Sequence, residues 1–170
     1  PLSDLIVFSC VPNREKTFGI LTKNGVSIFI VCPGFKTSFS SIFTTSIHST
    51  PSFIFSSPVA LDLKVPLILA RKPGKLPHEC YSRRFDLEYG SASIEVQKNS
   101  QITERDKILI IDDLVATGGT GLACCELFSD HFRVERSHIL FVAVIDLPML
   151  GGSQRIQEAG YGLEALVTYK

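Results

Sequence analysis

The sequence lacks tryptophan, has one methionine and carries no net charge, because its 17 basic side chains match its 17 acidic ones. This balance argues against a nucleic-acid-binding protein, in which basic side chains usually gather on one face. The charges are nevertheless uneven, with 8 basic and 3 acidic side chains in residues 1–75 against 9 and 14 in the remainder. A basic first half suits an anionic small molecule.

Cysteine is sparse, and its pattern excludes two kinds of stabilising site. The five cysteines are odd in number and show no C-x-x-C spacing, so we expect neither a disulfide framework nor a zinc site. Such cysteines are typical of a reducing compartment. No secretory signal is readable either, and we expect a cytoplasmic protein. The cysteines are Cys10, Cys32, Cys80, Cys124 and Cys125.

Charged residues are missing altogether from Thr37 to Leu61. A membrane helix needs about 20 predominantly apolar residues, whereas serines and threonines interrupt this stretch every few positions. Pro51 and Pro58 interrupt it further. We therefore predict no membrane span, and we interpret the stretch as a Ser/Thr-rich buried or loop segment.

Three apolar runs predict strands that are buried on both faces, namely Val65–Ala70, Lys107–Ile111 and Ile139–Ile145. Between the last two, the spacing of apolar side chains over Gly119–Phe132 predicts a helix. A strand, a helix and a strand within about 40 residues form a βαβ unit, which makes the two strands parallel.

Other segments give weaker signals. Ser91–Val96 alternates between apolar and polar residues, which indicates an antiparallel strand or hairpin arm outside the parallel core. Leu5–Phe8 and Val26–Val31 are candidate strands. No repeat or Pro/Gly-rich linker divides the chain, so we predict one α/β domain over residues 1–170, with a central, mostly parallel sheet flanked by helices.

A run of nine residues follows the Lys107–Ile111 strand, where ligands of parallel sheets bind. Two carboxylates come first, and paired glycines then lead into the predicted helix. Glycines let backbone N–H groups converge, and a helix N-terminus attracts anions, so this loop suits a phosphate. The run is Asp112, Asp113, Leu114, Val115, Ala116, Thr117, Gly118, Gly119 and Thr120.

Two better-known phosphate loops do not fit. No Walker sequence is present, and Gly119-Thr120-Gly121 lacks the third glycine of the dinucleotide fingerprint. Carboxylates beside a phosphate loop favour a phosphorylated sugar, because they accept hydrogen bonds from sugar hydroxyls. None of the four histidines, His48, His78, His131 and His138, belongs to a recognisable constellation.

Ile108–Thr120 resembles the phosphoribosyl-pyrophosphate motif of type I phosphoribosyltransferases, with four apolar residues, two acidic ones and then Ala-Thr-Gly-Gly-Thr. Arg71–Pro77 (Arg-Lys-Pro-Gly-Lys-Leu-Pro) and Leu87–Gly90 (Leu-Glu-Tyr-Gly), followed by Ile94–Lys98, resemble the adenine phosphoribosyltransferases in particular. The resemblance spans residues 53–170, and its C-terminal part is most like eukaryotic members.

The resemblance implies transfer of phosphoribosyl from phosphoribosyl pyrophosphate to adenine, giving AMP and pyrophosphate, with Mg²⁺ bound mainly through the substrate. It implies that Ala116–Thr120 holds the 5-phosphate, that Asp112 and Asp113 contact the ribose hydroxyls, and that Leu114 packs on the purine. Glu88 would assist proton transfer at adenine, and Tyr89 would close over the phosphate region. It also implies a homodimer.

The basic residues Arg71, Lys72 and Lys75 supply positive charge for the leaving pyrophosphate. We also expect a loop from Leu76 to Arg84 to close over the substrate and exclude water.

The sequence departs from the family at the pyrophosphate loop, where Pro51-Ser52 replaces Arg-Gly. We therefore treat residues 1–52 as a divergent segment. Two hypotheses remain: an active adenine phosphoribosyltransferase, or a catalytically impaired relative that binds phosphoribosyl pyrophosphate or AMP as a sensor or partner subunit.

Overall fold

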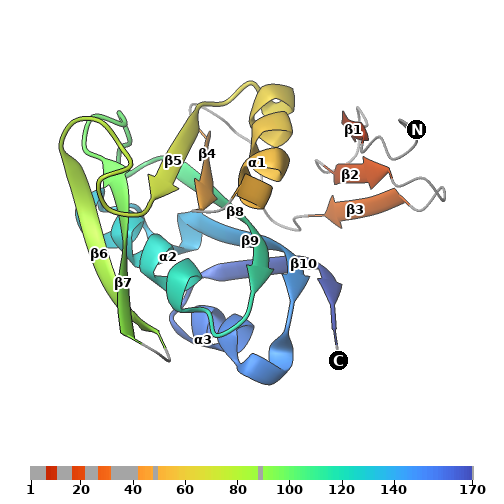
Figure 1. Cartoon of the computed structure of the whole chain (residues 1–170). Coiled ribbons are helices and arrows are strands. Elements are labelled where there is room, and N and C mark those ends of the chain that lie inside the picture. The colour runs from red at the N-terminus through yellow and green to blue at the C-terminus, as the bar shows by residue number, and fades with distance from the viewer. Residues whose placement is uncertain are drawn as a thin grey trace.

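A seven-stranded sheet with helices on both faces forms the body of the protein (Figure 1). The computed structural model describes residues 7–169 except 11–16, 22–26, 32–41, 48–49 and 88–89; side chains are described from residue 52 onward, apart from residues 87–89. The sheet order is β10-β9-β8-β4-β5-β7-β6. The strands are β4 (Ile42–Ile47), β5 (Leu67–Arg71), β6 (Cys80–Leu87), β7 (Gly90–Gln97), β8 (Lys107–Val115), β9 (Ile139–Asp146) and β10 (Gly162–Thr168).

Five of these strands, β10 to β5 in the sheet order, run parallel. Helix α1 (Thr50–Leu63) connects β4 to β5, and helix α2 (Gly119–His131) connects β8 to β9. A shorter helix, α3 (Gly152–Glu158), precedes β10; the 3-10 turns η1 (Arg136–His138) and η2 (Pro148–Leu150) flank β9. The predicted parallel βαβ unit is therefore confirmed.

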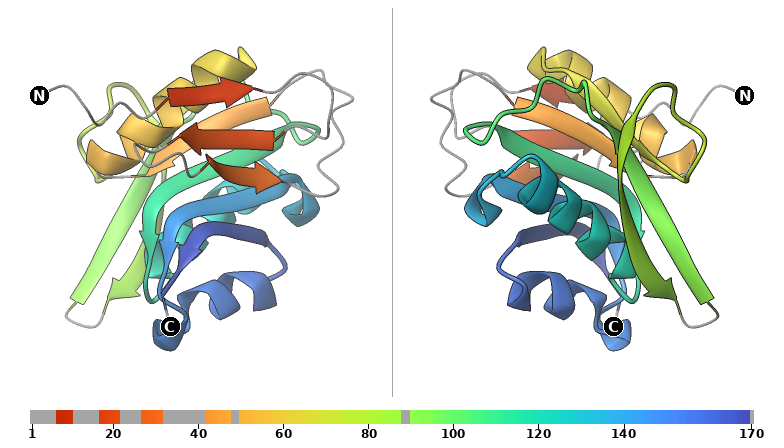
Figure 2. Two further views of the ribbon diagram at one scale, coloured as in Figure 1. Left: turned by 90° about the vertical axis from the view of Figure 1, so that its right-hand side faces the viewer. Right: turned by 90° about the vertical axis from the view of Figure 1, so that its left-hand side faces the viewer.

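The two long helices pack on opposite faces of the sheet (Figure 2). Alternate residues of β8 meet different helices: Leu109 and Ile111 join Val59 of α1 in one cluster, whereas Ile108 and Ile110 join Phe128 of α2 in the other. β4 and β8 are neighbours in the sheet. The helix that follows β4 packs on one face and the helix that follows β8 packs on the other, so the direction of the strand order changes between these two strands. Crevices at such switch points are where ligands bind in parallel sheets.

The three predicted strands are present with small changes of boundary. β8 continues to Val115, four residues beyond the predicted end at Ile111, because β9 keeps pairing with it through Val115 and Asp146. Asp112 and Asp113 thus lie within the strand rather than after it. The predicted helix over Gly119–Phe132 is confirmed as α2, in which Cys124, Cys125 and Phe128 are buried.

The predicted closing loop from Leu76 to Arg84 is wrong in its second half. Residues 80–84 belong to β6, which pairs antiparallel with β7 from Cys80 and Gln97 to Leu87 and Gly90. The predicted arm at Ser91–Val96 is β7, and it joins the same sheet through β5. Eight paired positions hold this segment as a hairpin.

The charge-free stretch contains regular structure that the composition does not indicate. β4 is a central strand, flanked by β8 and β5, and α1 begins three residues after it. Serine and threonine hide the strand because they lower its hydrophobicity, although threonine is a good strand former. No helix of the described residues is long and apolar enough to cross a membrane.

A separate three-stranded antiparallel sheet comes from the N-terminal part. It consists of β1 (Val7–Cys10), β2 (Thr17–Leu21) and β3 (Ser27–Val31), in that order. The strands predicted near Leu5–Phe8 and Val26–Val31 correspond to β1 and β3, whereas β2 is missed. Both views in Figure 2 place this sheet on the face of the larger sheet that α1 covers.

Candidate functional site

The predicted phosphate loop leads directly into α2. Gly118 caps the helix with φ of 74°, in the left-handed region that glycine adopts without strain. Its carbonyl accepts the N–H of Leu122 at 2.8 Å, and Gly118 and Gly119 are both buried. The first-turn N–H groups of α2 receive no side-chain cap and no acidic residue lies in that turn. The loop therefore presents a positive helix end to an anion.

A second glycine pair, not predicted from the sequence, supports this loop from behind. The N–H of Gly152 donates to the carbonyl of Ala116 at 3.0 Å. A Cβ on Gly152 would lie 2.2 Å from that carbonyl oxygen and 2.5 Å from the amide nitrogen of Gly118. Only a glycine permits this approach. Gly151-Gly152 is visible in the sequence, but nothing local indicates that it meets residues 116–118.

The acidic pair lies beside the first turn of α1. Ser52 is fully buried, and its Oγ donates to Asp112 Oδ1 at 2.7 Å and to Asp113 Oδ1 at 3.3 Å. Asp112 Oδ1 also accepts the N–H of Asp113 at 3.0 Å. Burial raises the pKa of the Asp112 carboxyl from 3.8 to about 7, and the hydrogen bond from Ser52 opposes that rise. Asp112 therefore changes charge near neutral pH.

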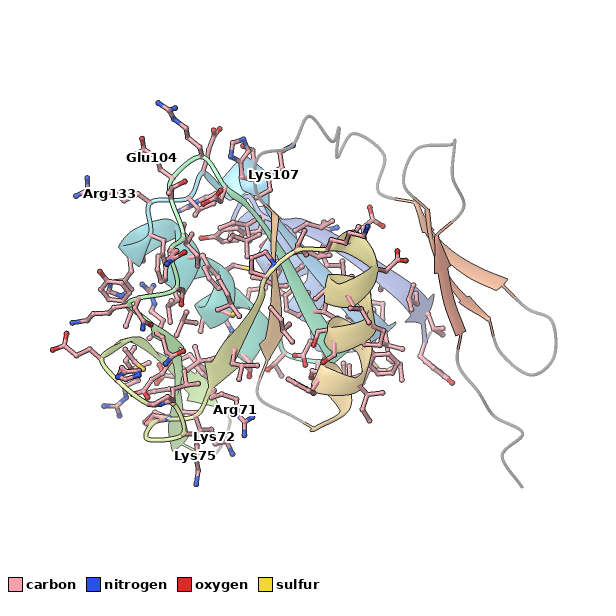
Figure 3. All side chains as sticks on the ribbon, turned by 90° about the horizontal axis from the view of Figure 1, so that it is seen from above. Arg71, Lys72, Lys75, Glu104, Lys107 and Arg133 are labelled. Carbon is pink, nitrogen blue, oxygen red and sulfur yellow. The ribbon has the colours of Figure 1, made fainter. Side chains whose placement is uncertain are left out.

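The basic residues lie at the end of β5, on a turn. The N–H of Lys75 donates to the carbonyl of Lys72 at 3.3 Å, and Gly74 has φ of 72°, as a Pro-Gly turn of type II requires. The side chain of Glu95 anchors this turn by accepting the N–H of Gly74 at 3.1 Å. Figure 3 shows Arg71, Lys72 and Lys75 together at one edge of the molecule, and all three are exposed.

A shallow, open hollow lies between the basic turn and the phosphate loop. Lys72 and Thr120 both line it, together with side chains of the hairpin. The hairpin approaches the loop closely, since a Cβ on Gly119 would lie 3.4 Å from the carbonyl oxygen of Asp86. The structure thus brings together the loop, the acidic pair and one of the predicted cations at a single end of the sheet.

Three other residues are predicted to belong to the site, namely Glu88, Tyr89 and Leu114. Glu88 and Tyr89 lie outside the described residues. Leu114 is 41% exposed on a strand whose other apolar residues are buried, which leaves its side chain available for a ligand. Among the side chains that the structure describes, no three of His, Cys, Asp or Glu are placed to hold a metal ion.

Fold and site together define a type I phosphoribosyltransferase. A curated adenine phosphoribosyltransferase of Pasteurella multocida is 39% identical over 168 residues, which cover 94% of this chain and 91% of that protein. The chain belongs to the adenine phosphoribosyltransferase family. No family model matches it. The 94% coverage includes part of residues 1–52, the segment treated above as divergent.

Two solved structures of the family are similar to this chain. The adenine phosphoribosyltransferase of Saccharomyces cerevisiae, complexed with an imino-altritol bisphosphate and adenine, has a TM-score of 0.66 and 30% identity. The match covers 76% of this chain and 69% of the yeast chain. The Giardia lamblia enzyme with 9-deazaadenine has a TM-score of 0.70 and 25% identity, over 96% of this chain and 94% of the other.

Proposed function

We propose that this protein transfers the 5-phosphoribosyl group from phosphoribosyl pyrophosphate to adenine, giving AMP and pyrophosphate in a purine-salvage reaction. This proposal rests mainly on one observation. The loop at Gly118 and the Asp112–Asp113 pair lie together at the switch point of the sheet, in a chain of this family. The bond from ribose C1 to the pyrophosphate oxygen breaks with its electron pair on oxygen. A ring nitrogen of adenine bonds to C1 and loses its proton.

The charges of the site match those that develop in this reaction. The ribose becomes more positive as the leaving group departs, so carboxylates are favourable beside it, whereas the pyrophosphate gains negative charge and needs cations. We assign Asp112 and Asp113 to the ribose hydroxyls, and the loop from Ala116 to Thr120 to the 5-phosphate. Arg71, Lys72 and Lys75 would face the pyrophosphate.

Three assignments complete the proposed site. Glu88 would assist proton transfer at adenine, Tyr89 would close over the phosphate region, and Leu114 would pack on the purine. Mg²⁺, where the donor brings it, would be held mainly through oxygens of the substrate. This chain fits such an ion, because Mg²⁺ keeps several waters and binds substrate phosphates rather than a complete protein cage.

One observation favours a second function. Pro51 and Ser52 stand in the first turn of α1, where the family pattern places Arg-Gly, so that turn contributes no cation at these two positions. A protein that binds phosphoribosyl pyrophosphate or AMP as a sensor or partner subunit would need the loop and the acidic pair but not that cation.

Pyrophosphate release with adenine, hypoxanthine and guanine separates the two functions. We expect release with adenine alone, and a loss of at least about tenfold in Asp113→Asn, because the ribose loses a charged partner. Asp62→Asn, an exposed acid on α1, is the matched control. Binding of AMP without release from any base would overturn the enzyme and support the sensor.

We also propose a cytoplasmic homodimer. The three cysteines that the structure describes are all free thiols, as is common in reducing compartments. Helix α1 turns large apolar side chains to solvent, with Ile54 58% and Leu61 80% exposed seven residues apart on one face. A second copy covering this face would bury them.

A further inference from the structure

A buried hydroxyl links the start of α1 to the acidic pair. Ser52 and Asp112 are 60 positions apart in the sequence, and their side chains meet because α1 follows β4, the strand next to β8. Ser52 is 0% exposed and Asp112 is 8% exposed. The 2.7 Å bond is therefore shielded from water, where a hydrogen bond to a charged group is at its strongest.

Two donors hold the same oxygen of Asp112. Oδ1 accepts from Ser52 Oγ and from the N–H of Asp113, so the plane of the carboxylate is fixed from two directions. The same hydroxyl also reaches Asp113 Oδ1 at 3.3 Å. Ser52 thus contacts both of the acids that the proposed function assigns to the ribose. Its own helix, α1, has no acidic residue in the first turn.

We propose that Ser52 is a positioning residue, whose hydroxyl orients the Asp112 carboxylate toward the ribose hydroxyls of a phosphoribosyl ligand. This inference rests on the proposed function and deepens it. The position that departs from the family pattern therefore acts on the sugar end of the site, rather than on the pyrophosphate. A glycine at position 52 would have no side chain to make this bond.

The hydroxyl of Ser52 also affects the protonation of Asp112. The described titratable groups that interact with it are Asp113 on its own strand and Cys124 on α2. Burial raises the pKa of Cys124 well above 9.0, so that thiol stays neutral. Burial and the side chain of Asp113 raise the pKa of Asp112, whereas the hydroxyl of Ser52 and the backbone N–H of Asp113 lower it by stabilising the ionised form. Removing the hydroxyl should therefore raise the pKa of Asp112 further.

The test compares Ser52→Ala, which removes the donor, with Ser52→Thr, which retains it. Ser56→Ala is the matched control, because Ser56 is equally buried on α1 but its Oγ bonds to the carbonyl of Phe53 in the same helix. Calorimetric binding of ribose 5-phosphate and of inorganic phosphate is the primary readout. We expect Ser52→Ala to bind ribose 5-phosphate about tenfold more weakly at pH 7.

Inorganic phosphate should bind Ser52→Ala as it binds the unmodified protein, since the loop from residue 116 to 120 is unchanged. Affinity for ribose 5-phosphate should rise with pH through about 7 in the unmodified protein. In Ser52→Ala the rise should move about 0.5–1 pH unit higher. The phosphate group of ribose 5-phosphate also changes charge in this pH range. This change affects binding to both proteins equally, so it does not contribute to the difference between them. Ser52→Thr should restore affinity and pH dependence.

Equal affinity and equal pH dependence in Ser52→Ala and the unmodified protein would overturn the inference, as would an equal loss in Ser56→Ala. Should Ser52→Ala fail to fold, Ser52→Gly removes the same hydroxyl and is judged by the same criteria. Weaker binding of ribose 5-phosphate by Ser52→Ala, without pyrophosphate release from any base, would support the positioning role of Ser52 and contradict only the proposed transferase activity.

Discussion

Gly118 and Gly152 meet at a distance that no other residue allows. A Cβ on Gly118 would lie 2.6 Å from the carbonyl oxygen of Gly152, and a Cβ on Gly152 would lie still closer to the phosphate loop. Backbone atoms cannot move aside as a flexible side chain does. The shape of the phosphate loop therefore depends on a residue more than 30 positions away.

Gly152→Ala tests this dependence at the residue scale. We expect a loss of about 1–3 kcal/mol in the free energy of unfolding from overpacking, and at least about tenfold weaker binding of ribose 5-phosphate, since the loop must shift. Thermal unfolding and calorimetry measure the two effects.

Gly151→Ala is the control for Gly152→Ala. Gly151 has φ of 73°, but a Cβ there meets nothing within 4 Å. Gly151→Ala should lower the free energy of unfolding by about 1–2 kcal/mol through backbone strain alone. It should bind ribose 5-phosphate as the unmodified protein does. Unchanged affinity in Gly152→Ala would contradict the supporting role of this glycine.

At the scale of elements, the β6–β7 hairpin is attached to α2 along its length. Arg83 donates to Glu126 at 2.6 Å and also to Asp130, one helical turn further on. The ring of Tyr81 stacks on His131 with centroids 4.6 Å apart. These contacts hold β6 against the helix that the phosphate loop leads into.

Arg83→Met should loosen the hairpin without unfolding the core. Both ion pairs are partly exposed, so we expect a global loss on the order of 1 kcal/mol. The amides of β6 and β7 should exchange faster, while those of β8 and β9 keep their protection. The KM for phosphoribosyl pyrophosphate should rise several-fold, because the hairpin lines the hollow beside the phosphate loop.

Lys98→Met provides the comparison, because the ion pair of Lys98 with Glu79 at 3.0 Å is more exposed and does not involve α2. Hydrogen exchange followed by mass spectrometry distinguishes the two variants. Identical exchange of β6 and β7 in both would show that Arg83 does not hold the hairpin.

At the scale of the whole molecule, the helices on the two faces of the sheet differ in their environment. The residues of α2 that face the sheet are buried and its outward side is polar, whereas α1 is apolar on its outward side as well, with Phe53 44% exposed in addition to Ile54 and Leu61. The helix that begins at the site therefore also carries the face that the proposed homodimer would cover.

Leu61→Glu should therefore dissociate the proposed homodimer, because a charge would be buried without a partner. Light scattering after size-exclusion chromatography should give twice the chain mass for the unmodified protein and the chain mass for the variant. Met149→Glu, at a residue 72% exposed away from α1, should remain dimeric. A monomeric unmodified protein at micromolar concentration would contradict the dimer.

The local pattern determined much of this protein. Apolar runs predict β5, β8 and β9, and β8 and β9 are buried nearly throughout, as strands covered on both faces require. The composition of Asp112–Thr120 identifies the loop, because acidic residues and paired glycines before a helix suit a phosphorylated sugar. The class of fold and the phosphate loop were therefore readable from residues close together in the chain.

Only the tertiary structure decided what meets that loop. β4 and α1 are not apparent in a Ser/Thr-rich stretch, because β4 takes its place by pairing with β8 and β5 rather than through an apolar run of its own. The contacts of Ser52 with Asp112, and of Gly152 with Gly118, join segments that the sheet order brings together. Sequence spacing contains no signal for such contacts, since the separation of residues along the chain does not determine which strands are neighbours.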